Sequence, residues 1–257
     1  MGEADFLELD GIVKRHGGRA ALDGVGLRVT RGAFVALVGP SGSGKTTLLK
    51  TLNRLVEPDA GEVRLEGRDV RQTPPATLRR GIGYVFQGIG LFPHLDVAAN
   101  IALPLRLAGV PGADREGRVA ALLDLVALPR DFARRRPAAL SGGQAQRVGL
   151  ARALAAGPPL MLMDEPFGAL DPVVRDELGR AYRALHERLG LTTIMVTHDM
   201  TEALLLADRI VVLIAGRIRA DAAPAELMRR GGDAAVRALL DVPRRQAERL
   251  AALERAE

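Results

Sequence analysis

The chain contains 257 residues with a formal net charge of +5, and it has no Cys. At about 100–200 residues per domain, this length fits one large domain or two small ones. Hydrophobic residues make up 47% and charged residues 26%, which is ordinary globular usage and excludes a mostly disordered chain. The absence of Cys excludes a disulfide framework, thiol catalysis and a zinc site held by thiolates.

No apolar run approaches the roughly 18 residues needed to cross a bilayer, and the acidic start lacks a signal-peptide pattern. We therefore expect a soluble, intracellular chain. The positive charge could indicate binding to nucleic acid or anionic lipid. However, the Arg residues are spread along the chain and aromatic residues amount to only 3%, so we expect no nucleic-acid partner.

Short apolar runs alternate with helical patterns along the chain. Runs typical of strands occupy residues 6–13, 25–29, 34–38, 82–86, 160–163, 193–197 and 210–214. Helical patterns occupy residues 45–52, 115–128, 143–155, 173–189 and 200–207. This alternation predicts an α/β fold with a mostly parallel sheet. Residues 88–140 lack a strand pattern, which predicts a helical insertion, and only helical patterns follow Asp221.

A Gly-rich segment directly follows the apolar run at 34–38. Residues 39–46 match G-x-x-x-x-G-K-[ST] at every fixed position. Between a strand and a helix, such a loop directs backbone N–H groups at phosphate oxygens. We expect Lys45 to reach the β- and γ-phosphates and Thr46 to ligate Mg²⁺. The alternative is a Gly-rich turn without a ligand. The predicted ATP-binding residues here are Gly39, Pro40, Ser41, Gly42, Ser43, Gly44, Lys45, Thr46 and Thr47.

Two carboxylates end the apolar run at 160–163. Asp164 and Glu165 would lie at the carboxyl edge of a parallel sheet, where ligands bind in such folds. We expect Asp164 to hold Mg²⁺, directly or through water, and Glu165 to polarise the water that attacks the γ-phosphate. Taken alone, such a strand end is more often structural. The preceding phosphate-loop motif favours the catalytic interpretation.

The segment Leu-Ser-Gly-Gly-Gln at residues 140–144 by itself predicts a Ser-capped helix start that could bind an anion. Its place in the chain is more informative. The phosphate loop, Gln87 after a strand, this segment, Asp164-Glu165, Ala169-Leu-Asp171 and His198 after a strand follow one another in that order. Over about residues 5–230 this arrangement resembles the ATP-binding subunit of ABC transporters.

The resemblance implies further roles. Ser141, Gly142, Gly143 and Gln144 would bind the γ-phosphate of ATP held by the other protomer of a homodimer. Gln87 would touch Mg²⁺ and the attacking water, Asp171 would cross the dimer interface, and His198 would contact the γ-phosphate. The implied cofactors are ATP and Mg²⁺. The implied catalytic residues are Glu165, His198, Gln87 and Lys45, and the implied metal ligands are Thr46, Gln87 and Asp164.

The resemblance also implies a fold. We expect a P-loop NTPase of the ABC type with a RecA-like core, an antiparallel β subdomain from the N-terminal strands, and a helical subdomain at about 88–155. The ATPase domain would span residues 1–232 and a short helical tail residues 233–257.

One position departs from the family pattern. The family usually places an aromatic residue, often Tyr, near residue 16 to stack on adenine, whereas this chain has His16. An imidazole offers less stacking surface and its charge varies with pH. We expect His16 either to stack on adenine with weaker discrimination than Tyr or to be an exposed loop residue.

Finer details resemble ATPases of osmoprotectant importers, which take up glycine betaine, choline or carnitine. These details are residues 51–58, residues 79–87 with the Gly-Ile-Gly-Leu-Phe-Pro-His that follows, and residues 243–246. A polar amino-acid or polyamine importer is the near alternative. A non-transport ABC ATPase is less consistent with one phosphate loop and no sustained heptads, and a small-molecule kinase leaves residues 140–144 unexplained.

The importer resemblance implies partners. Two integral-membrane permease subunits would bind the homodimer, with residues 88–97 suited to a groove for a partner helix, and an extracytoplasmic solute-binding protein would act indirectly. The subunit would be peripheral, at the cytoplasmic face of the inner membrane. Many such subunits carry a regulatory domain pair after the ATPase domain. This chain stops at Glu257, so we do not expect ionic-strength regulation of that kind.

Overall fold

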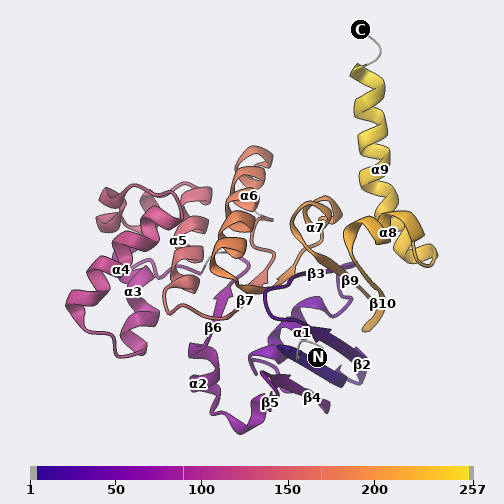
Figure 1. The fold of residues 1–257 in the computed structure, drawn as a ribbon, viewed down its shortest axis with the longest axis horizontal. Coiled ribbons are helices and arrows are strands. Elements are labelled where there is room, and N and C mark those ends of the chain that lie inside the picture. Colours follow the sequence, from indigo (N-terminus) through magenta and orange to yellow (C-terminus); the bar gives the residue numbers. More distant parts are fainter. Residues whose placement is uncertain (1–4, 89, 169, 255–257) are drawn as a thin grey trace.

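The computed structural model describes residues 5–88, 90–168 and 170–254. Two sheets with helices packed around them form this part of the chain (Figure 1). The larger sheet has the order β10-β9-β3-β8-β7-β6. Its strands are β3 (Phe34–Val38), β6 (Ile82–Val85), β7 (Leu160–Asp164), β8 (Thr192–Val196), β9 (Arg209–Ile214) and β10 (Arg217–Ala222). Neighbouring strands are parallel except β9 and β10, which confirms the predicted, mostly parallel sheet.

The central strands of this sheet are buried on both faces. Every residue of β3, β7 and β8 is buried, as is typical of parallel strands covered by helices on each side. Because these strands are parallel, their carboxyl ends at Val38, Asp164 and Val196 lie at one edge of the sheet. The segments that follow the three strands are therefore brought close together.

The second sheet is antiparallel and has the order β2-β1-β4-β5. Its strands are β1 (Leu7–His16), β2 (Arg19–Val29), β4 (Ala60–Leu65) and β5 (Arg68–Asp69). Helix α1 (Lys45–Leu52) packs between the two sheets, since Leu48 and Leu49 share one buried cluster with Leu9 of β1 and Ile194 of β8. This packing fixes the start of α1, where the Gly-rich segment ends.

Helices occupy the described chain between β6 and β7, where no strand is present. They are α3 (Val97–Leu107), α4 (Gly112–Leu125) and α5 (Gly142–Leu154), with short 3-10 turns η2 (Arg130–Arg134) and η3 (Pro137–Ala139). They form a separate group on the left of Figure 1, beside α6 (Pro172–Leu189). A helical insertion was expected here; its limits at 88 and 155, and the domain boundary at 232, stay predictions.

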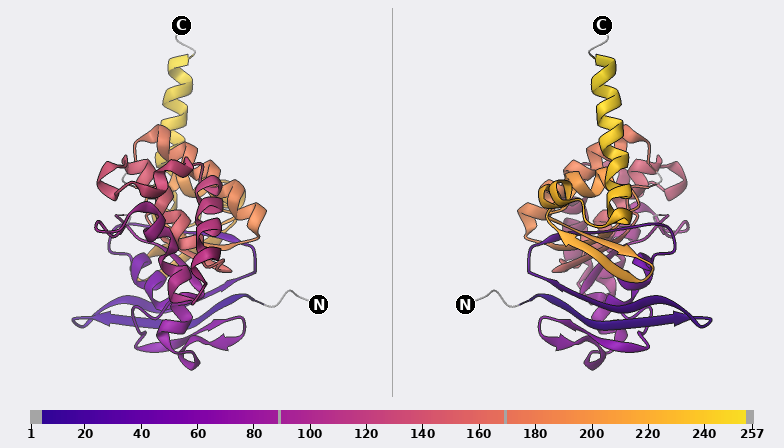
Figure 2. Two further views of the ribbon diagram at one scale, coloured as in Figure 1. Left: turned by 90° about the vertical axis from the view of Figure 1, so that its left-hand side faces the viewer. Right: turned by 90° about the vertical axis from the view of Figure 1, so that its right-hand side faces the viewer.

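The C-terminal part begins with α7 (Met200–Leu206) and α8 (Pro224–Arg230) and ends in α9 (Ala234–Glu254). Figure 2 shows α9 projecting away from the rest of the molecule. Its first turns pack on α7, and its side chains Leu239, Val242 and Pro243 line a pocket shared with Gly39 and His198. No helix within the described ranges combines the length and the apolar character that crossing a membrane requires.

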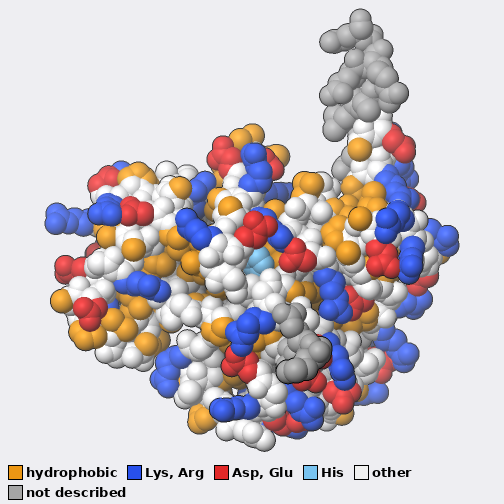
Figure 3. All heavy atoms as spheres, viewed as in Figure 1, with side chains coloured by type: hydrophobic (Ala, Val, Ile, Leu, Met, Phe, Trp, Pro, Cys, Tyr) orange, Lys and Arg blue, Asp and Glu red, His pale blue; other side chains and the backbone are white. Residues whose placement is uncertain are grey.

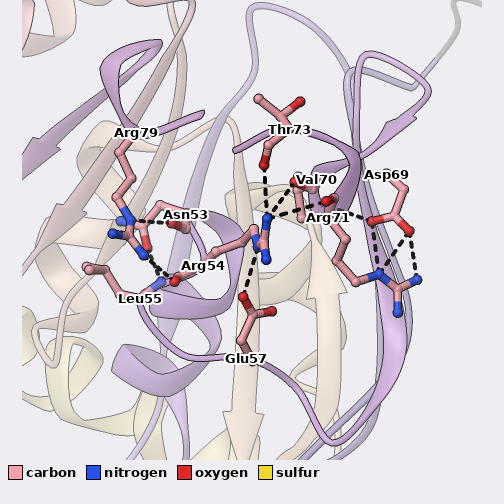
Figure 4. A network of polar contacts seen from close by, with 9 residues as sticks. All are labelled: Asn53, Arg54, Leu55, Glu57, Asp69, Val70, Arg71, Thr73 and Arg79. Atoms are coloured by element: carbon pink, nitrogen blue, oxygen red, sulfur yellow. Dashed lines mark hydrogen bonds and ion pairs between the residues drawn. The ribbon is translucent and has the colours of Figure 1, made fainter. Parts of the chain in front are cut away.

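Arg side chains hold the connection that follows α1 (Figure 4). Arg54 donates to Glu57 Oε1 at 2.8 Å and to the carbonyl of Thr73 at 2.9 Å. Arg79, in α2 (Pro75–Arg80), donates to the carbonyl of Asn53 at 3.0 Å. The single turn η1 (Val70–Gln72) begins at the Asp69 cap, which accepts from the Arg71 N–H at 2.8 Å. These bonds tie the end of α1 to the chain that leads into β6.

Basic and acidic side chains are intermixed over the face seen in Figure 3. Many of them are paired, as in Arg217–Asp23 at 2.7 Å and Arg183–Asp208 at 2.7 Å. The net charge of +5 is therefore not gathered into one basic patch on this face.

The sequence prediction lacks β4, β5, β10, α2 and α3. Residues of β10 alternate between exposed and partly buried, so this edge strand carries too few apolar residues to resemble a core strand. Helix α3 contains Pro104, which weakens a helical pattern because proline removes a backbone donor. The helix predicted at 115–128 starts earlier and ends at Leu125, since Ala127 has a positive φ of 54°. The strand predicted at 25–29 begins at Arg19.

Candidate nucleotide site

The phosphate loop connects β3 to α1, as its sequence predicted. Gly44, which precedes α1, has φ 106°, and a Cβ at this position would lie 2.3 Å from the carbonyl oxygen of Ala21. Only glycine permits this backbone conformation and this close approach of β2. The N-terminal end of α1 therefore lies open to an anion while the antiparallel sheet supports the loop from one side.

The Lys45 ammonium bends back into this loop. Its Nζ donates to the carbonyl of Gly39 at 2.7 Å and to that of Pro40 at 2.9 Å. Burial lowers the pKa of Lys45, and the nearby carboxylates of Glu165 and Asp164 oppose that shift. The amine thus lies inside the ring of loop atoms that would surround phosphate oxygens.

Thr46 and Asp164 meet at the carboxyl edge of the sheet. The Thr46 hydroxyl lies 3.0 Å from Asp164 Oδ1 and donates to it. Burial raises the pKa of Asp164, while the bond from Thr46 and the charge of Lys50 oppose the shift. A hydroxyl and a carboxylate oxygen beside a phosphate site are the donors that Mg²⁺ prefers. The described residues contain no cluster of three His, Asp or Glu side chains that could hold a metal.

Glu165 lies at the centre of a second group. Gln87 Nε2 donates to Glu165 Oε2 at 3.2 Å, and His198 Nδ1 lies 3.3 Å from the same oxygen. These residues follow β6, β7 and β8, so three strand ends supply one cluster. Glu165 has a positive φ of 47°, an uncommon conformation for this residue type, and its N–H donates to the carbonyl of Val196 at 2.9 Å.

The segment 141–144 forms the start of α5 and lies in the helical part. Ser141 Oγ accepts from the Gln144 N–H at 3.3 Å, and the Ser141 N–H donates to Gln144 Oε1 at 3.0 Å, which completes a capping box. A Cβ at Gly143 would lie 2.5 Å from Val174 Cγ1, so glycine allows α5 to approach α6. Within the described residues, no hydrogen bond joins segment 141–144 to the phosphate loop.

Among the described residues, neither Asp171 nor His16 forms a hydrogen bond or ion pair with Glu165, Gln87 or His198. Asp171 caps α6, since its Oδ1 accepts from the Val174 N–H at 3.0 Å. His16 is exposed at the end of β1, opposite Arg19. The geometry gives no contact that tests either role, and both stay predictions. Ile89 and Ala169, which belong to two of the segments singled out above, lie outside the described residues.

Sequence reasoning missed two charged residues beside this cluster. Arg175 in α6 bonds to Asp199, which follows His198. Glu202 in α7 is partly buried, and burial raises its pKa to about 6, although a hydrogen bond with Thr197 acts in the opposite direction. The spacing Asp199-x-x-Glu202 has the form of a capping sequence and could have drawn attention to this helix start.

A glycine-rich loop between a strand and a helix, with a hydroxyl and two carboxylates beside it at the edge of a parallel sheet, is typical of a P-loop nucleotide-binding domain. Residues 22–168, more than half of the chain, match the family model described as ABC transporter. The chain therefore belongs to the ABC transporter family, as an ATP-hydrolysing cassette, which confirms the family and fold expected from the sequence.

Two curated relatives with different named solutes and one solved structure are similar to this chain. The glycine betaine/carnitine/choline transport ATP-binding protein OpuCA of Bacillus subtilis (strain 168) is 47% identical over 225 residues, 87% of this chain and 59% of the relative. The sulfate/thiosulfate import ATP-binding protein CysA 2 of Chromobacterium violaceum is 50% identical over 231 residues, 89% of this chain and 61% of the relative. The chain thus spans about three fifths of the length of such curated relatives.

The third is a solved structure, described as the dimeric post-hydrolysis state of the ATP-binding cassette MJ0796 bound to ADP and Pi. It has a TM-score of 0.76 and 34% identity, and the match covers 85% of this chain and 98% of that chain. At 34% identity the two chains resemble each other in sequence as well as in fold.

Proposed function

We propose that this chain hydrolyses ATP to power an importer of quaternary-amine osmoprotectants such as glycine betaine, choline or carnitine. It would act as a peripheral subunit at the cytoplasmic face of the inner membrane. The observation that carries the proposal is the convergence of Gln87 and His198 on one oxygen of Glu165, with Lys45 close enough for its charge to interact with that carboxylate.

The chemistry follows from these positions. Glu165 would accept a proton from the water that attacks the γ-phosphate, and the Gln87 amide would keep the carboxylate oriented. Lys45 would neutralise charge that develops on the phosphoryl oxygens, and His198 would donate a hydrogen bond to one of them. Mg²⁺, held by Thr46 and Asp164, with Gln87 near it, would supply further charge neutralisation.

The proposal includes a homodimer that encloses ATP. Ser141 and Gly142 are exposed at the N-terminal end of α5, where free N–H groups and the helix dipole favour an anion. Within one chain this end makes no hydrogen bond to the phosphate loop among the described residues. A second copy placed head to tail would present Ser141 to the γ-phosphate and exclude water, and the similar MJ0796 cassette is described as dimeric.

A groove near Gln87 suits a membrane partner. Its volume is about 660 Å³, and α2, β6 and α3 contribute to its lining. Phe86, Phe92 and Leu107 line it and are 45%, 41% and 62% exposed, which is typical of an apolar surface that receives another protein. We propose that each copy of this chain in the homodimer receives, in this groove, a short helix from one of the two permease subunits. Phe86 directly precedes Gln87, which donates a hydrogen bond to Glu165. A shift of Phe86 caused by the permease helix would therefore change the position of Gln87 relative to Glu165.

The identity of the transported solute is the part of the proposal that this chain constrains least, because no residue of the subunit needs to contact the solute. The likeness to OpuCA supports a quaternary amine, while the likeness to CysA 2 supports sulfate or thiosulfate as a second candidate. In either case a solute-binding protein outside the membrane would deliver the solute to the permease.

Uptake in the source organism tests this proposal. Disruption of the gene should abolish uptake of radiolabelled choline or glycine betaine in high-salt medium and leave sulfate uptake unchanged. Plasmid-borne wild-type chain should restore uptake, and the Glu165→Gln variant should not. Loss of sulfate uptake alone would support the second candidate, and unchanged uptake of both solutes would contradict the proposed role in import of either.

A further inference from the structure

The Arg175 side chain spans two segments that flank the catalytic cluster. Its Nη1 donates to Asp199 Oδ2 at 3.3 Å, and its Nη2 donates to the carbonyls of Leu170 at 3.2 Å and Gly168 at 3.4 Å. One guanidinium therefore joins the loop after β7 to the loop after β8. The sequence gives these segments no local connection, since Arg175 and Asp199 are 24 residues apart.

On the first side, the contact leads to Glu165. The N–H of Gly168 donates to the carbonyl of Glu165 at 3.3 Å. The same loop leads to Asp171, the cap of α6, so Arg175 one turn later folds back over the loop that precedes its own helix.

On the second side, the contact leads to His198. Asp199 uses Oδ1 to accept from the N–H groups of Thr201 and Glu202 at 2.8 and 3.2 Å, and its own N–H donates to Thr197 Oγ1 at 3.0 Å. Arg175 binds the other carboxylate oxygen, Oδ2. The bonds to Oδ1 already hold this carboxylate in place, so Arg175 contacts a group whose position is fixed. His198, directly before Asp199, has a side chain that is 60% exposed, and its backbone is the part that Asp199 can restrain.

The geometry points to Arg175 as a positioning residue for ATP hydrolysis, which holds Gly168 and Leu170 close to segment 197–199 so that His198 stays within reach of Glu165. The two members of the pair are 31% and 33% exposed, and ion pairs that reach water add little to stability. The main effect of the Arg175–Asp199 pair is therefore to fix the relative position of the two loops and not to stabilise the fold. This inference depends on ATP hydrolysis by the cassette and not on the solute proposed above.

The test compares Arg175→Ala with Arg180→Ala in the purified chain. Arg180 lies on the same helix and forms an exposed ion pair with Asp176 at 2.6 Å, so it controls for loss of a charge and of an ion pair. We expect Arg175→Ala to lower kcat about tenfold while the nucleotide Kd stays within about twofold, and Arg180→Ala to change neither. Arg175→Lys should be intermediate, because an ammonium can pair with Asp199 but cannot form the fork.

Two further measurements distinguish positioning from a general structural role. Hydrogen exchange should rise in peptides covering residues 197–207 in Arg175→Ala and not in Arg180→Ala. Asp199→Asn keeps the helix cap and removes the charge, so its effect on kcat should overlap with that of Arg175→Ala instead of multiplying with it. Three results would each overturn the assignment. The first is an equal kcat in Arg175→Ala and Arg180→Ala, and the second is unchanged hydrogen exchange at residues 197–207. The third is a variant with both Arg175→Ala and Asp199→Asn in which the two effects on kcat multiply.

Discussion

The Thr46 hydroxyl and the Asp164 carboxylate lie 3.0 Å apart although 118 residues separate them in the chain. Thr46 begins α1 after β3, and Asp164 ends β7, with β8 between these two strands in the sheet. The two sequence segments that predicted a magnesium site therefore meet because parallel strands bring their carboxyl ends to one edge. The same edge carries Glu165, directly after Asp164.

Glu165→Gln should lower ATP turnover at least about a hundredfold and leave the nucleotide Kd within about twofold. An amide cannot take the proton from water, but it keeps the shape of the side chain and can still contact Gln87. Turnover and fluorescent-nucleotide binding are measured on the same protein, with the exposed Glu177→Gln variant as the control. Near-normal turnover would show that another group activates the water.

Ser141→Arg should reduce ATP hydrolysis at least about tenfold while binding of ATP to the isolated chain stays unchanged. The bulky cation would block the helix end that a second copy uses. Because Ser141 also caps α5, its loss should cost about 1 kcal/mol of stability. Ser141→Ala loses the same cap and hydroxyl without adding bulk, so it should reduce hydrolysis less than Ser141→Arg does. If both variants hydrolyse ATP as fast as the wild type, the shared site is refuted.

His16→Tyr should tighten ATP binding several-fold more than GTP binding, because a larger aromatic ring stacks better on adenine. His16 is exposed at the end of β1, and β2, which follows it, supports Gly44 of the phosphate loop. His94→Tyr, at an exposed position in the chain before α3, adds the same ring elsewhere. Affinities for both nucleotides that match the wild type would mean that His16 does not contact the base.

Glu202→Gln should stabilise the protein at neutral pH. Burial raises the pKa of Glu202 to about 6 from 4.5, so the folded state disfavours its charged form. The cost of burying the charge is present above pH 6 and disappears below the unfolded pKa. The variant should therefore gain about 2 kcal/mol at pH 7.5 and about 1 kcal/mol at pH 5.0.

Urea unfolding of both proteins at the two pH values measures this gain. The exposed Glu116→Gln variant should show no such change with pH. A Glu202→Gln gain that is the same at pH 5.0 and pH 7.5 would show that titration of this group is not the cause.

Local patterns in the sequence determined much of this protein. The buried strands β3 and β7 appear as apolar runs, and the loop at 39–46 is defined by glycine, Lys and Thr at fixed spacing. The cap at Ser141 depends on two residues three positions apart. Each of these features depends on neighbours in the chain, so the sequence alone could predict it.

Only the tertiary structure decided which of these segments touch. Gln87 and Glu165 are 78 residues apart, and Arg175 carries no local sign that it binds Asp199. The approach of Gly143 to Val174 likewise depends on how two helices cross. Strand order and helix packing set such contacts, since they result from burying apolar surface over the whole fold. The edge strand β10 was missed for a related reason, because its assignment depends on pairing with β9 and not on its own hydrophobicity.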